Sequence, residues 1–199
     1  MRDVIVLGSG GHAKVVISTL LAAGRRVRAC YDDDAARHGM KVLGIPVAGL
    51  LREAPLDAEA VIGLGNNRTR RDVAEARPLN WTTAVHPTAS VDPTARIGPG
   101  TVVFAGAILQ PDVEVGPHAV INVAATVDHD GRVGAFSQIA AGAHLGGTVE
   151  LGEGGFVGAG ASVIENRVIG AWSTVGAGAV VIRDVPPDVT VVGVPADVR

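Results

Sequence analysis

Cysteine, lysine and aromatic side chains are scarce in this chain of 199 residues, and each shortage excludes a class of protein. Cys30 is the one cysteine, so no disulfide can form within the chain, and a reducing, cytoplasmic location is expected. Two lysines, 3% aromatic residues and a formal net charge of −3 argue against a basic, base-stacking surface for nucleic acid. No apolar run approaches the ~20 residues that cross a membrane, and the charged start predicts no signal peptide. Neither nucleic acid nor a membrane is therefore an expected partner.

What the chain has instead is a repeat of six residues in its second half. From Val91 to Val181 every sixth residue is Val, Ile or Leu, and the residue four positions later is usually small, as at Ala95, Ala107 and Ala119. A period of six fits neither an α-helix nor a strand of a β-sandwich, which needs hairpin turns and period-two alternation. The repeat predicts triangular coils of eighteen residues that stack at ~4.8 Å like parallel strands. One aliphatic side chain on each side of the coil would point to the axis, and a small residue near each corner would let the backbone turn.

The first 84 residues carry a different pattern, in which apolar strands alternate with helices. The sequence predicts strands at 4–7, 27–31, 60–64 and 82–85, and helices at 13–23 and 68–77. This alternation is typical of a small parallel α/β domain. We therefore predict two domains, 1–84 and 85–199.

A glycine-rich turn follows the first predicted strand. Gly8-x-Gly10-x-x-Ala13 fits the dinucleotide-binding fingerprint, and Asp32 ends the second strand where a ribose-binding acid would lie. The domain is short for two mononucleotide-binding halves, which disfavours NAD. The glycines and the helix N-terminus offer free N–H groups to any phosphate, so the diphosphate of a nucleotide sugar suits the turn equally well.

Six histidines are present, and four of them have structural or solvent-exposed interpretations. His38 lies in a polar loop and His86 precedes Pro87 at the domain junction, while outward positions of the repeat predict exposed side chains for His118 and His144. His12, in the glycine-rich turn, is a candidate for substrate contact.

His129 is the strongest catalytic candidate because it lies between two carboxylates, Asp128 and Asp130. A carboxylate beside an imidazole fixes the tautomer of the ring and raises its basicity, as a general base near neutral pH requires. Val127 holds the inward position of this repeat, so His129 is predicted at a face or corner outside the coil.

Several short motifs occur in a fixed order along the chain: residues 8–16, Asp32-Asp33, Gly65-Asn66-Asn67 followed by Arg70, residues 86–89, Asn122 shortly before Asp128-His129-Asp130, and residues 192–196. Together they resemble the bacterial sugar O- and N-acetyltransferases of the NeuD/PglD type over essentially the whole chain. The resemblance implies an α/β Rossmann-like domain, then a left-handed parallel β-helix that forms a homotrimer. It also implies N-acetyl transfer from acetyl-CoA to a UDP-linked 4-amino-4,6-dideoxy sugar in bacterial glycan biosynthesis.

The resemblance further implies roles for particular residues. His129 is the base, and Asp130 or Asp128 orients it. The Gly147 amide, one coil later, polarises the thioester carbonyl. This amide is expected to come from the adjacent subunit. The residues expected to contact the nucleotide sugar are Ser9, Gly10, Gly11, His12, Lys14, Asp32, Asp33, Gly65 and Asn66. Those expected on the acetyl-CoA side are Asn122, Gln138, Gly147, Gly193 and Pro195. Gln138 stands where relatives tend to have a second histidine, so it cannot relay a proton, and no metal is expected.

Three other functions compete with N-acetyl transfer as interpretations of the sequence. A γ-type carbonic anhydrase carries two histidines five residues apart, and no pair here has that spacing. A non-catalytic trimeric scaffold would bind the sugar nucleotide without binding CoA. O-acetylation of a sialic acid is the serious competitor, because one base and one donor site serve both reactions. Asp32 and Asp33 disfavour it, since they would repel the carboxylate of a sugar acid.

Overall fold

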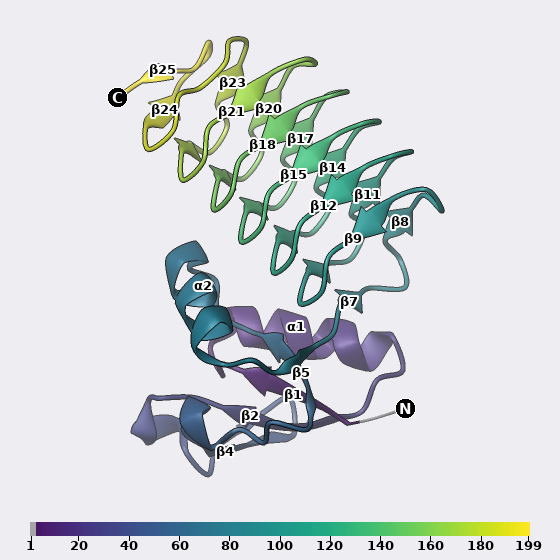
Figure 1. Ribbon diagram of the computed structural model, residues 1–199, viewed down its shortest axis with the longest axis vertical. Helices are drawn as coiled ribbons and strands as arrows, with labels where there is room; N and C mark the ends of the chain where they lie inside the picture. The colour runs from purple at the N-terminus through teal and green to yellow at the C-terminus, as the bar shows by residue number, and fades with distance from the viewer. Residues whose placement is uncertain (1–2) are drawn as a thin grey trace.

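The computed structural model describes residues 3–199, which form an α/β unit followed by a left-handed parallel β-helix (Figure 1). The α/β unit has a sheet of order β3-β4-β2-β1-β5-β6, parallel except between β3 and β4. Its elements are β1 (Val4–Leu7), α1 (Gly11–Ala22), β2 (Val27–Tyr31), β3 (Lys41–Val42), β4 (Ile45–Gly49), β5 (Glu59–Ile62), α2 (Asn67–Ala76) and β6 (Asn80–Trp81), with 3-10 turns at Ala35–Arg37 and Leu51–Glu53.

The predicted α/β pattern is confirmed, with differences at the edges. The segment predicted as a loop after Asp34 contains β3 and β4, which extend the sheet at its far edge. Of the strand predicted at 82–85, only residues 84 and 85 are in a strand, and β6 lies just before the predicted segment. β6 pairs with β5, whereas the next strand, β7 (Ala84–Val85), already pairs with β10 of the β-helix. The predicted boundary between residues 84 and 85 falls inside β7 and stays a prediction.

The β-helix has three faces, each a ladder of two- or three-residue strands. The first face contains β7, β10 (Val102–Val103), β13 (Val120–Ile121), β16 (Gln138–Ile139), β19 (Phe156–Val157), β22 (Thr174–Val175) and β24 (Thr190–Val192), with β25 (Asp197–Val198) added antiparallel. The second face contains β8 (Ser90–Val91), β11 (Ile108–Leu109), β14 (Thr126–Val127), β17 (His144–Leu145), β20 (Ser162–Val163) and β23 (Val180–Val181). The third face contains β9 (Arg96–Ile97), β12 (Glu114–Val115), β15 (Arg132–Val133), β18 (Glu150–Leu151) and β21 (Val168–Ile169).

The six-residue repeat forms the core of the β-helix, as predicted. From Val103 to Val181 every sixth residue is at most 4% exposed, while Val91 and Ile97 of the first coil are half-buried. Parallel partners lie eighteen residues apart, as in the pair Val103 and Ile121. Each coil therefore adds three aliphatic side chains to one continuous apolar column.

The small residues lie near the corners, as predicted, and the turn itself comes one position before them in most repeats. The small residues fill the inside of the corners, and the residue before them adopts a positive φ. That residue is glycine at some corners, but at many it is not: Asp112, His118, Ala124, Asp130, Phe136, Thr148, Asn166 and Trp172 have φ between 54° and 59°. Left-handed backbone is unfavourable for side chains other than Gly, Asn and Asp, so stacking of the coils imposes it.

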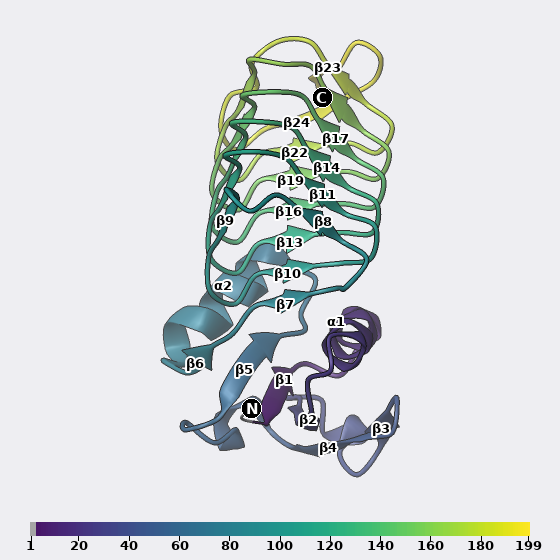
Figure 2. The same cartoon turned by 90° about the vertical axis from the view of Figure 1, so that its right-hand side faces the viewer.

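Helix α1 lies between the sheet of the α/β unit and the β-helix (Figures 1 and 2). Its apolar side packs in one cluster with β1 and with the outward side chains Val102 and Val120 of the first face. Phe104, in the turn after β10, belongs to the same cluster. The two units thus share a core.

Because the column is continuous, a cavity in a central coil should destabilise the whole β-helix. We expect Ile139→Ala, at a fully buried position, to lower the free energy of unfolding by about 2–5 kcal/mol. Val168→Ala, at a position 45% exposed, should lower it by less than about 0.5 kcal/mol. Urea denaturation followed by circular dichroism measures both, and equal losses would contradict a packed column.

Candidate active site

His129 lies in the turn between β14 and β15, at the corner where the second face meets the third. Its Nδ1 is 2.7 Å from Asp130 Oδ2, and because an ionised carboxylate only accepts, Nδ1 carries the proton and donates it. The lone pair of the neutral ring is then on Nε2. Asp130 reaches the ring because it occupies the positive-φ position of the turn, with φ 57°. The His129 side chain is 56% exposed, so a substrate can reach it.

The hydrogen bond to Asp130 raises the pKa of His129, and the negative charges of Asp128 and Asp130 act in the same direction. Asp128 is not within hydrogen-bond distance of the ring. Its Oδ1 accepts from the backbone N–H of His129 at 2.8 Å. The geometry therefore gives Asp130, rather than Asp128, the place beside the imidazole.

Gly147 lies one coil further along, directly against the His129 ring. A Cβ at Gly147 would be 2.7 Å from His129 Nε2, so the ring occupies the space that any other residue would need. Within residues 3–199 the Gly147 amide has no hydrogen-bond acceptor. The same position is proline at Pro93 and Pro111 in earlier coils, so the turn itself leaves this N–H free. The Nε2 lone pair and a free N–H donor thus lie side by side in one chain.

A groove of about 450 Å³ runs along the second face from this corner. Its walls include Asp128, Gly146 and Glu165 at the corner and Ile108 and Ile164 beside them. Beyond its far end, the loop after β24 closes the last coil of the face, where Gly193 O accepts from Val180 N. Gly193 and Pro195 therefore lie at the C-terminal end of the second face. His129 lies at the edge of the same face, near its middle.

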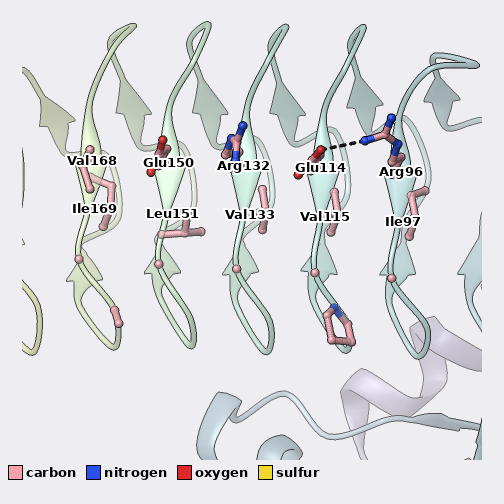
Figure 3. A pocket seen from close by; sticks show the side chains of 17 residues that line it. Arg96, Ile97, Glu114, Val115, Arg132, Val133, Glu150, Leu151, Val168 and Ile169 are labelled. Atoms are coloured by element: carbon pink, nitrogen blue, oxygen red, sulfur yellow. Dashed lines mark hydrogen bonds and ion pairs between the residues drawn. The ribbon is translucent and has the colours of Figure 1, made fainter.

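A larger groove, of about 760 Å³, lies along the third face, away from the imidazole (Figure 3). Its outward side chains alternate in charge: Arg96, Glu114, Arg132 and Glu150 form a row above the aliphatic side chains, as Figure 3 shows. Arg96 and Glu114 form an ion pair at 3.0 Å. The groove holds no group with the protonation chemistry of His129, so its size does not make it the catalytic centre.

The glycine-rich turn has open space where a ligand could approach. A Cβ at Gly10 or Gly11 would meet no atom within 4 Å, whereas Gly8, with φ +112°, is packed against Gly63 and Leu64. The role of Gly8 is therefore packing. Gly10 and Gly11 leave the N-terminus of α1 uncovered.

Asp32 closes this turn against the end of β2. Its Oδ2 accepts from Ser9 N at 2.7 Å and from Ser9 Oγ at 2.6 Å, and its Oδ1 accepts from Asp34 N at 3.0 Å. Burial raises the pKa of Asp32, but these hydrogen bonds and the nearby Arg37 outweigh it and lower the pKa overall. Asp33 is exposed and gives one oxygen to Leu51 N, so its second oxygen is the freer acceptor.

Three cationic side chains gather beside Ser9. Lys14, Lys41 and Arg37 line one small pocket with it, so both lysines of the chain are found here. Arg37 Nη1 also donates to Ser9 O at 3.2 Å. This cluster, together with the open N-terminus of α1, suits an anionic group such as a diphosphate.

His12 and His118 lie at the junction of the two units, on either side of Arg70. His118 was predicted to be exposed, and this is wrong: it is 5% exposed, stacks on Phe136 at 5.3 Å and meets Trp81 edge-on. The ring of His12 packs edge-on against Phe104. Burial, with a further contribution from Arg70, lowers the pKa of each histidine to about 4. Both are therefore neutral near pH 7.

Two residues predicted on the acetyl-CoA side lie away from His129 in the same chain. Gln138 is an outward side chain of the first face, between Val120, which packs with the α1 cluster, and Phe156, which faces the turn at Gly65 and Asn66. Asn122 is at the corner between the first and second faces, where its Oδ1 accepts from Val123 N. The structure therefore brings His129, Asp130 and Gly147 together but not these two.

Sequence reasoning missed the contacts that α2 makes with the β-helix. Arg70, 1% exposed, donates Nε–H to His118 O at 2.7 Å and Nη2–H to Phe136 O at 2.8 Å. Asn67 Nδ2 donates to Gly154 O at 3.1 Å, and Arg68 lies over the Trp172 ring. A sequence signal existed, because the bulky turn residues at 118, 136 and 172 are multiples of eighteen apart.

Within residues 3–199, no three His, Cys, Asp or Glu side chains are placed to hold a metal ion together. In the same part of the chain, neither helix has the length and apolar character needed to cross a membrane.

The comparisons with known proteins agree on one family. The family model for the PglD N-terminal domain matches residues 3–76. A UDP-N-acetylbacillosamine N-acetyltransferase of Bacillus subtilis (strain 168) is 41% identical over 113 residues, which is 53% of this chain and 52% of that protein, so the match spans about half of the relative.

Two solved structures match over nearly their whole length. A histidine-to-alanine mutant of GDP-perosamine N-acetyltransferase from Caulobacter crescentus, in complex with CoA and GDP-perosamine, is 40% identical with a TM-score of 0.94 and covers 100% of this chain and 97% of that one. The acetyltransferase domain of PglB from Neisseria gonorrhoeae FA1090, in complex with acetyl-CoA, is 37% identical with a TM-score of 0.94, covering 100% and 99%.

The fold and the exposed histidine–carboxylate pair define a hexapeptide-repeat acyltransferase with an N-terminal α/β unit. Within that class, the chain belongs to the family of PglD/NeuD-type sugar acetyltransferases.

The buried histidines make stability depend on pH. Because the pKa of His118 is lowered in the folded state from 6.5 to about 4, the unfolded chain binds the proton more readily, and stability falls as pH drops from about 6.5 to about 4. We expect His118→Phe, which resembles Phe136 at the equivalent turn position, to flatten the pH dependence of the urea midpoint in this window. His144→Ala, at an exposed histidine of the second face, is the matched control. An unchanged slope in His118→Phe would contradict a neutral buried imidazole.

Proposed function

We propose that this protein transfers the acetyl group of acetyl-CoA to the amine of a nucleotide-linked amino sugar in bacterial glycan biosynthesis. The observation that carries the proposal is the His129 Nε2 lone pair beside the free Gly147 N–H at an exposed corner. The relatives named above support the reaction class, since two of them are N-acetyltransferases and the two solved structures are complexes with CoA and GDP-perosamine or with acetyl-CoA.

The chemistry needs one base and one oxyanion donor. The sugar amine attacks the acetyl carbonyl carbon, and His129 Nε2 takes the proton that the nitrogen loses. The Gly147 N–H stabilises the negative charge that develops on the carbonyl oxygen. The C–S bond then breaks, CoA leaves as the thiolate, and the imidazolium gives its proton to that thiolate, which restores the neutral base. Asp130 holds the ring in the required tautomer and stabilises its charged form.

The α/β unit supports a nucleotide-linked substrate rather than a free sugar. The diphosphate is placed over Gly10 and Gly11 at the N-terminus of α1, beside Lys14. The free oxygen of Asp33 is available to a hydroxyl or imide N–H of the nucleoside, since the oxygens of Asp32 already hold Ser9 and Asp34. The groove on the second face, which ends near Gly193 and Pro195, is assigned to the acetyl donor.

A complete site requires a second copy of the chain. The α/β unit docks on the first face (Figure 1). The turn between β14 and β15 lies at the corner between the second and third faces, which is the corner opposite the first face. The outward side chains of the second face, unlike those of the third, include no Asp, Glu, Lys or Arg: they are Ser90, Ile108, Thr126, His144, Ser162 and Val180. We propose a homotrimer in which the second face of each chain meets its neighbour, with the groove for the acetyl donor left open between the two chains. The Asn122 corner and α/β unit of one chain then approach His129 of the next.

The test of the proposed function is thiol release from acetyl-CoA against UDP-, GDP- and dTDP-linked 4-amino and 3-amino sugars, with sialic acid as the hydroxyl control. We expect turnover with an amino sugar and its loss by about 10²–10⁴-fold in His129→Ala, because general base catalysis contributes that much. Glu150→Ala, at an exposed residue of the third face, should keep near wild-type turnover. Survival of acetylation in His129→Ala would overturn the role of the base, and turnover with sialic acid alone would overturn the substrate class.

The pH profile tests the pairing of His129 with Asp130. Since Asp130 raises the pKa of His129, and the base works when unprotonated, activity falls as pH drops through that raised pKa. We expect Asp130→Asn to move the acidic limb of kcat/KM to lower pH while reducing the maximum rate. Asp128→Asn, which removes a nearby charge but no hydrogen bond to the ring, should move the limb less. A larger shift in Asp128→Asn would make that carboxylate the orienting group.

A further inference from the structure

Helix α2 lies along the stacked corners where the third face turns into the first. Four successive coils contact it: Arg70 bonds to the carbonyls of His118 and Phe136, Asn67 to that of Gly154, and Arg68 covers Trp172. These corner residues recur every eighteen positions. One helix of the α/β unit is therefore held by a column of corners rather than by a single turn.

Arg70 is the centre of this contact. On the β-helix side its guanidinium bonds to His118 O, Phe136 O and Ser137 O at 2.7, 2.8 and 3.3 Å. On the other side it donates to Leu64 O and Gly65 O at 3.2 and 3.3 Å. These two carbonyls lie in the turn that packs against His12 of the glycine-rich segment. One side chain thus ties the substrate edge of the α/β unit to two coils.

The other contacts at the junction fix the orientation of the α/β unit on the β-helix much less firmly. Helix α1 meets the first face through Val102, Phe104 and Val120, and apolar burial is not directional, so such a surface tolerates small slides and rotations. The planar guanidinium has donors in a fixed fork, and all its partners are fixed backbone or amide oxygens. Burial lowers the pKa of Arg70 to about 10, which still leaves it charged at neutral pH.

We propose that Arg70 is a positioning residue for the transfer reaction: it sets where the nucleotide-sugar edge of the α/β unit stands relative to the β-helix. This inference rests on the proposed function. In the trimer the sugar amine is delivered by the α/β unit of one chain to His129 of the next, so the docking of each unit fixes the attack geometry. A misplacement of about 1 Å can cost about a hundredfold in rate.

The experiment compares Arg70→Lys with the wild type and with Arg77→Lys. Arg77 follows the last turn of the same helix and donates to Ala54 O inside the α/β unit. Arg77→Lys therefore removes a guanidinium–carbonyl bond without changing a contact with the β-helix. We expect Arg70→Lys to lower kcat for the amino sugar by at least about tenfold, with the dissociation constants of CoA and of the nucleotide sugar changed less than about twofold. A merely structural loss would instead weaken nucleotide-sugar binding in step with turnover. Wild-type kcat in Arg70→Lys, or an equal loss in Arg77→Lys, would overturn the proposal.

A second readout does not depend on turnover. Spin labels at Asp57→Cys in the α/β unit and Glu150→Cys on the third face, both exposed sites, report the distance between the units when labelled chains are diluted with unlabelled ones. We expect one narrow distance distribution in the Arg77→Lys background and a broader or displaced one with Arg70→Lys. An unchanged distribution would overturn the positioning role even if no sugar were acetylated. The failure of this inference is thus separable from the failure of the proposed function.

Discussion

Backbone hydrogen bonds between successive coils are the constraint on which the rest of this structure depends. They pair each strand with the one eighteen residues later, as Thr126 pairs with His144, and the spacing falls to sixteen only in the last coil, where Thr174 pairs with Thr190. Side chains eighteen apart are therefore neighbours on the surface. This places Gly147 against His129, aligns the alternating charges of the third face and stacks the corners that α2 contacts.

The candidate site is built from small departures from the repeat. The corner turn gives no backbone acceptor to one N–H in every coil, and proline at several corners removes that N–H, whereas Gly147 keeps it and makes room for an imidazole. The next turn position requires positive φ, and with aspartate there the carboxylate reaches the preceding histidine. A structural repeat with two suitable substitutions thus provides a base, its orienting group and an N–H donor.

The junction of the two units combines two kinds of contact with different roles. The packing of α1 on the first face buries apolar side chains, and the hydrogen bonds of Arg70 orient the α/β unit on the β-helix. His118 serves the junction as a neutral aromatic ring, stacked on Phe136 and held under α2. Because the glycine-rich turn and His129 lie on different sides of one chain, the proposed function would have this junction control how two chains combine into one site.

The sequence by itself determined the β-helix, its core and the two carboxylates beside His129, but not which of the two contacts the ring. Each of these depends on a short period or on neighbouring residues in one turn. It did not determine the burial of His118, the place of Gln138 opposite the α/β unit or the role of Arg70. Those depend on how the α/β unit packs on the β-helix, through contacts such as that between Arg70 and His118, 48 residues apart. A local pattern shows which side chain points outward, but tertiary packing decides whether water or another part of the chain covers it.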